Sequence, residues 1–263
     1  MNTRFVVRGT LLALVLVGVA ALAAISSINS ARFPPLEPTP PRPMINAPRG
    51  ELPVAPVGLT EYTQYANAEY NRVGCGFIIG LTTDQLVGVT TAHSVAFDAA
   101  APLQRIALGV AGRSSFVARF DRFHGLPGTA RSGEDMSVDY VLLHVASANP
   151  IDPARILRPD PRGLPQPGER VILYSGLHSE QTYSGTVQSA SLQAVWVVMD
   201  DAFDPAGLSG SPFVSQHTGD VIGMVIATTQ RGGRVLLGAH PIGSLVRLAE
   251  AATEFPLIST YRR

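Results

Sequence analysis

Lysine is absent from this 263-residue sequence, and cysteine occurs only once, at Cys75. Without lysine the chain cannot form a Schiff base, supply the lysine of a P-loop or use a lysine as a general base. A single cysteine forms neither an internal disulfide nor a zinc site made of several cysteines. Packing of side chains must therefore hold the fold together, and Cys75 itself is expected to be a buried apolar thiol.

Charged residues are also scarce, at 15% of the chain, and the 20 basic residues balance the 20 acidic ones. Because no net charge attracts a polyanion, we expect no nucleic-acid partner. Four of the histidines lack the spacing and the neighbouring carboxylates of a metal site, so we expect no metal and no cofactor; they are His124, His144, His178 and His217. Hydrophobic residues make up 46% of the chain, which excludes disorder over most of its length.

Residues 1–32 have the pattern of an export signal or a membrane anchor. Arg4 and Arg8 precede an apolar run over residues 11–25. Positive charge before such a run predicts that the rest of the chain is exported, to the periplasm or outside the cell. The run is short for a spanning helix, and Ala21 and Ala23 offer a small-residue cleavage site, so a cleaved signal peptide and an uncleaved anchor helix both remain open.

Residues 33–58 form a proline-rich linker, with nine prolines in 26 positions. No helix or central strand tolerates that density. We therefore expect an extended, semi-rigid spacer, which would hold a folded domain away from a membrane if the anchor is kept. The folded domain is expected over residues 59–263.

That domain reads as short strands separated by turns. Apolar or alternating runs of about four to eight residues lie between breaks rich in Gly, Pro, Asp and Ser, which predicts an all-β fold. The predicted strands cover residues 76–81, 85–91, 105–110, 115–120, 140–145, 170–174, 184–190, 194–199, 212–215, 221–228 and 235–240. Leu245, Val246, Leu248 and Ala251 recur at helical spacing, so one C-terminal helix is expected over residues 242–253.

Three short segments carry side chains suited to catalysis. His93 directly follows an apolar strand, and Asp139 stands immediately before another. Ser209 lies between two glycines, which permit a tight turn that exposes a hydroxyl and aims peptide N–H groups at one point. Taken singly, each feature is more often structural: a histidine at a strand end, a capping aspartate, a plain loop.

Taken together, in the order His, Asp, Ser, these segments resemble the trypsin/chymotrypsin-like serine endopeptidase family. Residues 90–93 (TTAH) resemble the T-A-A-H element of the family, residues 139–143 (DYVLL) its D-[IV]-A-L-L element and residues 207–212 (GLSGSP) its G-[DN]-S-G-[GS]-P element. The separations of 46 and 70 residues suit the compact bacterial members. The resemblance covers residues 74–250.

The resemblance implies two six-stranded antiparallel β-barrels, a C-terminal helix and an active site in the cleft between the barrels. It implies Ser209 as the nucleophile and His93 as the base that accepts its proton. Asp139 would orient the imidazole, with Asp135 as the alternative carboxylate. The backbone N–H groups of Gly207 and Ser209 would form the oxyanion hole.

Some positions depart from the family pattern. Leu208 stands where the trypsin branch has an aspartate that captures a newly cut amino terminus, so activation by that route is not expected. Phe203 stands where an acidic residue selects basic side chains, so an apolar or small substrate side chain is expected instead. The strand that pairs with substrate backbones would include Met224, Val225 and Ile226. His240 follows a strand of the expected pocket wall, and it either reads a substrate carboxylate or has a structural role.

Two functions of different classes follow. The first is an exported serine endopeptidase that cleaves protein or peptide substrates through an acyl-enzyme. The second is a catalytically silent relative that binds extended polypeptides by strand addition, as a scaffold or regulator. The presence of all three triad side chains favours the enzyme. An esterase-like hydrolase is a third alternative, although Ser211 replaces the second glycine of the G-x-S-x-G elbow.

Overall fold

The computed structural model describes residues 33–97, 99–131, 133–146 and 150–262. The chain divides into two compact units, Met1–Leu36 and Glu37–Arg263. The predicted leader of residues 1–32, with its helix, lies outside the described residues, and residues 33–36 contain neither helix nor strand. In the part of the chain that is described, no helix is both long and apolar enough to cross a membrane.

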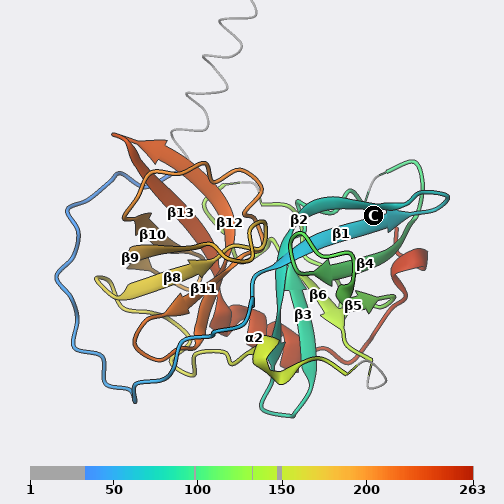
Figure 1. The fold of residues 1–263 in the computed structure, drawn as a ribbon, viewed down its shortest axis with the longest axis horizontal. Coiled ribbons are helices and arrows are strands. Elements are labelled where there is room, and N and C mark those ends of the chain that lie inside the picture. Colours follow the sequence, from blue (N-terminus) through green and yellow to red (C-terminus); the bar gives the residue numbers. More distant parts are fainter. Residues whose placement is uncertain (1–32, 98, 132, 147–149, 263) are drawn as a thin grey trace, which may run out of the picture. The chain divides into compact units, whose positions relative to one another are not determined.

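The first half of the folded unit is a seven-stranded sheet (Figure 1). Its hydrogen-bonded order is β5-β4-β1-β2-β3-β6 with antiparallel neighbours, and β7 adds to β2 in parallel. The strands are β1 (Leu59–Tyr65), β2 (Tyr70–Gly80), β3 (Leu86–Thr90), β4 (Leu103–Gly109), β5 (Phe116–Phe120), β6 (Val141–His144) and β7 (Ile156–Leu157).

The expectation of a closed six-stranded barrel is wrong for this half. In the described residues no strand ladder joins β5 to β6, the two ends of the order, and a single bridge between Phe123 and Leu143 spans the gap. The C-terminal segment covers the same side, since Leu257 bridges Arg122. This half is therefore a half-barrel, closed by isolated bridges and by the returning chain instead of by a sixth pairing.

The second half is the closed six-stranded barrel that the family resemblance implies, in the order β10-β13-β12-β11-β8-β9. Its strands are β8 (Arg170–Tyr174), β9 (Thr182–Ala190), β10 (Val195–Met199), β11 (Pro212–Ser215), β12 (Val221–Arg231) and β13 (Arg234–Pro241). Each of the eleven predicted strand segments overlaps one of β2–β6 and β8–β13. The pattern does not predict β1 or β7.

Each half has its own apolar core. In β8, Val171 and Leu173 are fully buried while Arg170 and Ile172 are partly exposed, so alternate side chains point to the barrel interior. Fully or nearly fully buried side chains include Phe120, Phe123 and Leu143 in the core of the half-barrel, and Phe213, Val197 and Leu237 in the core of the barrel.

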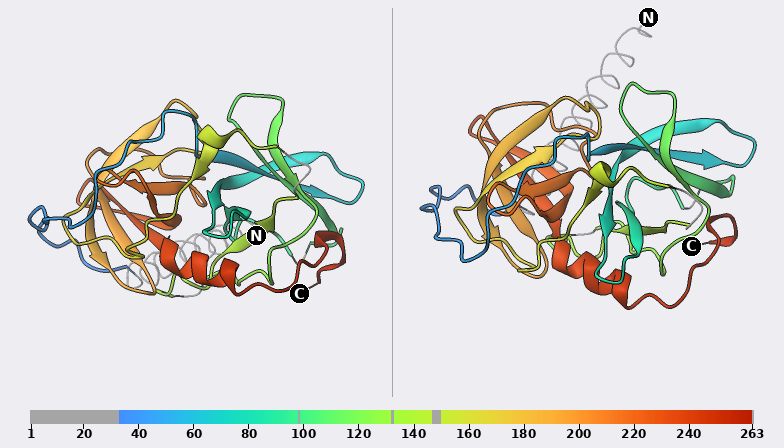
Figure 2. Two further views of the ribbon diagram at one scale, coloured as in Figure 1. Left: turned by 90° about the horizontal axis from the view of Figure 1, so that it is seen from below. Right: turned by 60° about the horizontal axis from the view of Figure 1, so that its bottom comes forward.

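One C-terminal helix, α2 (Ile242–Glu250), follows β13, as predicted, and it ends three residues earlier than expected. It buries Ile242, Leu245 and Ala249 and packs on β12 and β13. The chain then runs back to the half-barrel, where Ile258 joins the first core. Figure 2 shows this path, with α2 below the barrel and the chain end beside the other half. The last segment therefore ties the two halves together.

The proline-rich residues 37–58 contain no helix or strand, as expected, but they lie along the barrel instead of standing clear of it (Figure 1). His217 Nε2 lies 2.7 Å from Ala47 O, and the Gly50 N–H donates to His217 O (3.0 Å). Farther along, the Tyr174 hydroxyl donates to Pro53 O (3.0 Å). A chain without its own backbone pairing offers free carbonyls, and side chains of the barrel bind them.

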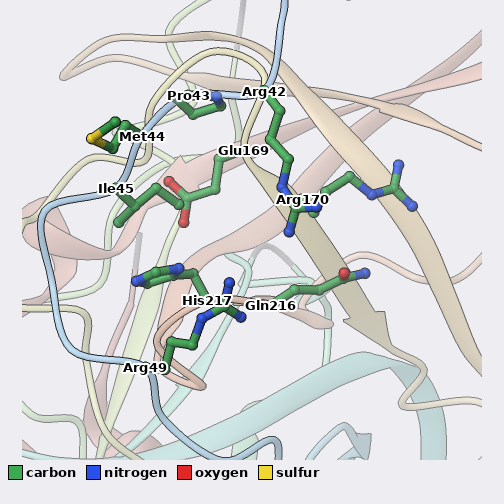
Figure 3. A pocket seen from close by; sticks show the side chains of 9 residues that line it. All are labelled: Arg42, Pro43, Met44, Ile45, Arg49, Glu169, Arg170, Gln216 and His217. Atoms are coloured by element: carbon green, nitrogen blue, oxygen red, sulfur yellow. The ribbon is translucent and has the colours of Figure 1, made fainter.

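A cavity of about 200 Å³ lies between this segment and the barrel. Figure 3 shows Arg42 and Arg49 reaching from the segment toward Arg170 and His217 of the barrel. Glu169, also in the wall, is fully buried and is paired with a partner outside the cavity lining, Arg162. This cavity belongs to the docked segment, and its lining contains none of the triad residues predicted above.

Candidate active site

The histidine and the aspartate come together at one edge of the half-barrel. Strands β3 and β6 are antiparallel neighbours with Thr90 opposite Val141, so the end of β3 and the start of β6 lie at the same edge. His93 follows the first and Asp139 precedes the second. His93 Nδ1 lies 2.8 Å from Asp139 Oδ2, which is hydrogen-bond distance.

The Asp139 carboxylate is fully buried and accepts four hydrogen bonds. Oδ1 accepts from the backbone N–H groups of Ala92 (2.8 Å) and His93 (3.1 Å). Oδ2 accepts from the backbone N–H of Arg131 (3.1 Å) as well as from His93 Nδ1. Burial acts to raise the pKa of Asp139, but the hydrogen bond and the charge of His93 and the backbone donors outweigh it, and the pKa is lowered.

An ionised Asp139 fixes the tautomer of His93. Because the carboxylate can only accept, Nδ1 carries the proton and Nε2 is left as a free base. The His93 side chain is 33% exposed, so Nε2 can be reached from outside. The alternative carboxylate takes no part: Asp135 Oδ1 accepts from the N–H and the hydroxyl of Ser137, and no hydrogen bond joins it to His93 in the described residues.

Ser209 lies in a tight turn just before β11, and two glycines make the turn possible. Gly207 and Gly210 have φ angles of 78° and 92°, which disfavour any residue with a Cβ. A Cβ at Gly210 would also lie 1.8 Å from the carbonyl oxygen of Cys75. The turn is held from both halves, because the Cys75 N–H donates to Ser209 O (2.9 Å) and the Gly210 N–H donates to Val225 O (2.8 Å).

Two N–H groups of this turn are unused in the described part of the chain, those of Gly207 and Ser209. The N–H of Leu208 between them donates to Pro205 O (3.3 Å), and that of Ser211 to Leu208 O (2.9 Å). The two free donors are the ones predicted for the oxyanion hole. No hydrogen bond joins Ser209 Oγ to His93 in the described residues, whereas His93 is joined to Asp139.

The residues expected to contact substrate lie in and near β12. Val225 and Ile226 are only 2% and 3% exposed, and Met224 is fully buried, so this strand can offer backbone groups but not these side chains. The register of β12 on β13 shifts between Val225 and Ala227, which leaves Ile226 outside the ladder. Phe203 is partly buried, and its ring stacks on Tyr183 at a centroid distance of 4.0 Å.

Two other titratable residues near the triad are buried. Burial raises the pKa of the Cys75 thiol to about 12, which agrees with the expected inert thiol. His240 is 0% exposed, so it cannot read a substrate carboxylate, and burial lowers its pKa to about 4. In the described residues no group of three or more His, Cys, Asp or Glu side chains could hold a metal ion.

No protein-family model matches the chain, and no curated protein sequence does. Several solved structures are similar. Kallikrein-related peptidase 10 matches with a TM-score of 0.55 at 16% identity, over 76% of this chain and 95% of that one. Catalytically active tobacco etch virus protease, complexed with product, matches with a TM-score of 0.50 at 16% identity, over 83% and 87%. Tobacco vein mottling virus protease matches with a TM-score of 0.50 at 14% identity, over 84% and 94%.

These matches show the fold. The chain has the trypsin/chymotrypsin-like architecture, with one closed barrel, one half-barrel and a short C-terminal helix. The structural neighbours are proteases by name.

Proposed function

We propose that this protein is a serine endopeptidase with Ser209 as nucleophile, His93 as base and Asp139 as the orienting carboxylate. The single observation that carries the proposal is the buried Asp139 carboxylate, which accepts from His93 Nδ1 and leaves Nε2 free to take a proton. The protease fold of the structural neighbours and the two unused N–H groups beside Ser209 support it.

The chemistry follows from this arrangement. Ser209 Oγ attacks the carbonyl carbon of the scissile peptide bond while its proton passes to His93 Nε2. The negative charge that develops on the carbonyl oxygen is stabilised by the N–H groups of Gly207 and Ser209. The C–N bond breaks, His93 gives its proton to the leaving amine, and an acyl-enzyme remains. Water, deprotonated by His93, then releases the acid and restores Ser209, and no step requires a metal or cofactor.

We further propose that the substrates are extended polypeptides met outside the cytoplasm, in the periplasm or beyond the cell, and that the chain is of a bacterial type. The charged-then-apolar pattern of residues 1–32 supports export, with membrane attachment if that segment is kept. The backbone of β12, free of its ladder at Ile226, is the strand along which a substrate would pair.

The test is labelling of the full-length protein, purified in detergent, by a small fluorophosphonate. Intact-mass and peptide mass spectrometry should find one adduct, on Ser209, because only an activated serine reacts at a useful rate. Ser209→Ala should not label. Ser114→Ala, which removes an exposed serine far from this turn in the sequence, should label like the wild type.

An adduct that persists in Ser209→Ala contradicts the site assignment. A folded wild-type protein that never labels contradicts the endopeptidase, and the silent relative that binds polypeptides would then be the better proposal. Folding is checked in the same samples by the fluorescence of Trp196, which is buried in the barrel.

A further inference from the structure

The carboxyl group of Glu61 has no access to solvent, and Glu61 is not one of the three residues of the proposed triad. It lies in β1, between β2 and β4, and is 0% exposed. Gly74 of β2 makes room for it, because a Cβ at that position would lie 3.0 Å from Glu61 Oε2. An ionised carboxylate in such surroundings is strongly disfavoured unless both of its oxygens are paired.

The hydrogen bonds of Thr90 indicate the protonation state of Glu61. Thr90 Oγ1 lies 2.7 Å from Glu61 Oε2 and 2.7 Å from the carbonyl oxygen of Cys75. A hydroxyl has one proton and a carbonyl oxygen can only accept, so this proton belongs in the bond to Cys75. The proton between Thr90 and Glu61 must then come from Glu61. A neutral carboxylic acid, protonated at Oε2, satisfies both contacts, and a carboxylate does not.

The second oxygen of Glu61 leads to the same assignment. Oε1 is buried and has no hydrogen-bond partner among the described residues. In a carboxylate, Oε1 would carry negative charge without a partner. In a neutral acid it is an uncharged carbonyl oxygen, and burying that without a partner costs much less free energy. Burial raises the pKa of Glu61 to about 8.

The same hydrogen bonds continue to the turn of Ser209. Cys75 accepts from Thr90 through its C=O, and through its N–H it donates to Ser209 O (2.9 Å). Thr90 also ends β3, three residues before His93. The Glu61 side chain therefore acts through Thr90 on Cys75, the residue of β2 whose N–H binds the serine turn. Thr90 belongs to β3, the strand that precedes His93.

We propose that Glu61 is a positioning residue: as a neutral acid it donates to Thr90, fixes the main chain of Cys75 and so holds Ser209 against His93. This inference rests on the proposed function, because it takes Ser209 as the nucleophile. Ionisation of Glu61 removes the donated proton and leaves Thr90 between two acceptors. Reactivity of Ser209 should therefore fall as the pH rises through the ionisation of Glu61.

The other titratable groups on β1 and on the elements packed against Glu61 are Tyr62 and Tyr65 of β1, Tyr70, Arg72 and Cys75 of β2, Arg105 of β4 and His93 after β3. The pKa of Cys75 is raised to about 12, and arginine keeps its proton throughout the range tested below. A general base acts in its unprotonated form, so the role proposed for His93 predicts no fall in reactivity as the pH rises, unlike the role of Glu61. An alkaline fall that Glu61→Gln abolishes is thus specific to Glu61.

The test compares the full-length wild type with Glu61→Gln, Glu61→Leu and a matched control, Glu69→Gln, which changes an exposed acid after the same strand. The rate of fluorophosphonate labelling is measured from pH 7 to 9.5. A group with a pKa of about 8 is about 90% ionised one unit higher, so the wild type and Glu69→Gln should label about tenfold more slowly at pH 9 than at pH 7.

Glu61→Gln also has an N–H donor for Thr90 and cannot ionise, so its rate should change by less than about twofold over the same range. Glu61→Leu has no donor and should be slow at every pH. A residue that only stabilised the fold would lower the unfolding temperature of Glu61→Leu without giving the wild type an alkaline fall that Glu61→Gln abolishes. An equal alkaline fall in Glu61→Gln overturns the proposal.

Nuclear magnetic resonance decides the same inference without catalysis. The ¹³C shift of the Glu61 carboxyl should report a neutral acid at pH 7, and an ionised group there overturns the proposal. If no variant labels at any pH, the endopeptidase function fails separately. The amide of Cys75 then decides the inference, since its shift must follow the Glu61 titration in the wild type and stay constant in Glu61→Gln.

Discussion

Replacement of Asp139 by asparagine should stop His93 from acting as a base while the protein still folds. The side chain can take two orientations. With its NH₂ group in the place of Oδ1, it would face the backbone N–H groups of Ala92 and His93, which are both fixed donors. With its NH₂ group in the place of Oδ2, it faces only one fixed donor, the N–H of Arg131, and the imidazole. The second orientation is therefore preferred.

In that orientation the imidazole must accept at Nδ1. Its proton therefore moves to Nε2, and Nε2 can no longer accept a proton from Ser209. Loss of the correct tautomer in a triad of this kind costs about 10⁴ in rate, or about 5.5 kcal/mol of activation free energy. One partly buried N–H, that of Arg131, loses Asp139 as its acceptor, which costs up to about 1–3 kcal/mol of folding stability. Asp139→Asn should fold, with a lower midpoint of unfolding, and label at about a ten-thousandth of the wild-type rate.

The assay is the second-order rate of fluorophosphonate labelling of the full-length protein, with urea unfolding followed by the fluorescence of Trp196. Asp135→Asn is the matched control, because among the described residues that carboxylate accepts hydrogen bonds from Ser137 alone. Its rate should stay within about twofold of the wild type, the range of an ordinary surface substitution. A near-normal rate in Asp139→Asn, or a large loss in Asp135→Asn, would refute the assignment of the carboxylate.

Three further predictions concern stability. Gly210→Ala should lower the free energy of unfolding by more than about 2 kcal/mol and abolish labelling, because its Cβ would lie 1.8 Å from Cys75 O at a φ of 92°. A urea titration measures the free energy of unfolding, and no change in it would contradict the turn geometry. Phe213→Ala should cost about 3–5 kcal/mol because the ring is fully buried, whereas Leu192→Ala, 62% exposed in the wild type, should change stability by about 0.5 kcal/mol or less. The pKa of Glu61 is raised from 4.5 to about 8 on folding, so the free energy of unfolding should fall as the pH rises between these values, by up to about 1.4 kcal/mol per unit, and Glu61→Gln should flatten this slope.

Hydrophobic alternation locates most of the fold because most strands have one apolar face. It predicts β8 and β11 to the residue. It misses β1, whose inward positions include Glu61 and Thr63, both fully buried polar residues, so the strand lacks the expected pattern. It also cannot show that β5 and β6 stay unpaired, since closure of a barrel depends on contacts between distant segments.

The pairing of His93 with Asp139 could be predicted from motif order, but the rest of their surroundings could not. The donor from Arg131 to Asp139 is a backbone group, so no residue type marks it. Glu61 gives no local signal either, because a single acid in a polar strand usually faces solvent. The sequence reading of His240 left a substrate contact open, and complete burial of its side chain excludes that role.

The main chain of Cys75 explains how two separate halves can share one site. Its N–H binds the serine turn of the barrel, and its C=O binds Thr90 at the end of the strand that precedes His93. The relative position of Ser209 and His93 is therefore set by backbone hydrogen bonds of β2 and by the close approach that Gly210 allows, where a Cβ would lie 1.8 Å from Cys75 O. Cys75→Ala would keep both of these backbone hydrogen bonds and lose the one from Cys75 Sγ to Gly207 O (3.2 Å), whereas any side chain at Gly210 pushes the turn away from Cys75 O. The Glu61 side chain acts on this backbone connection through Thr90, so its protonation can affect a serine that it does not touch.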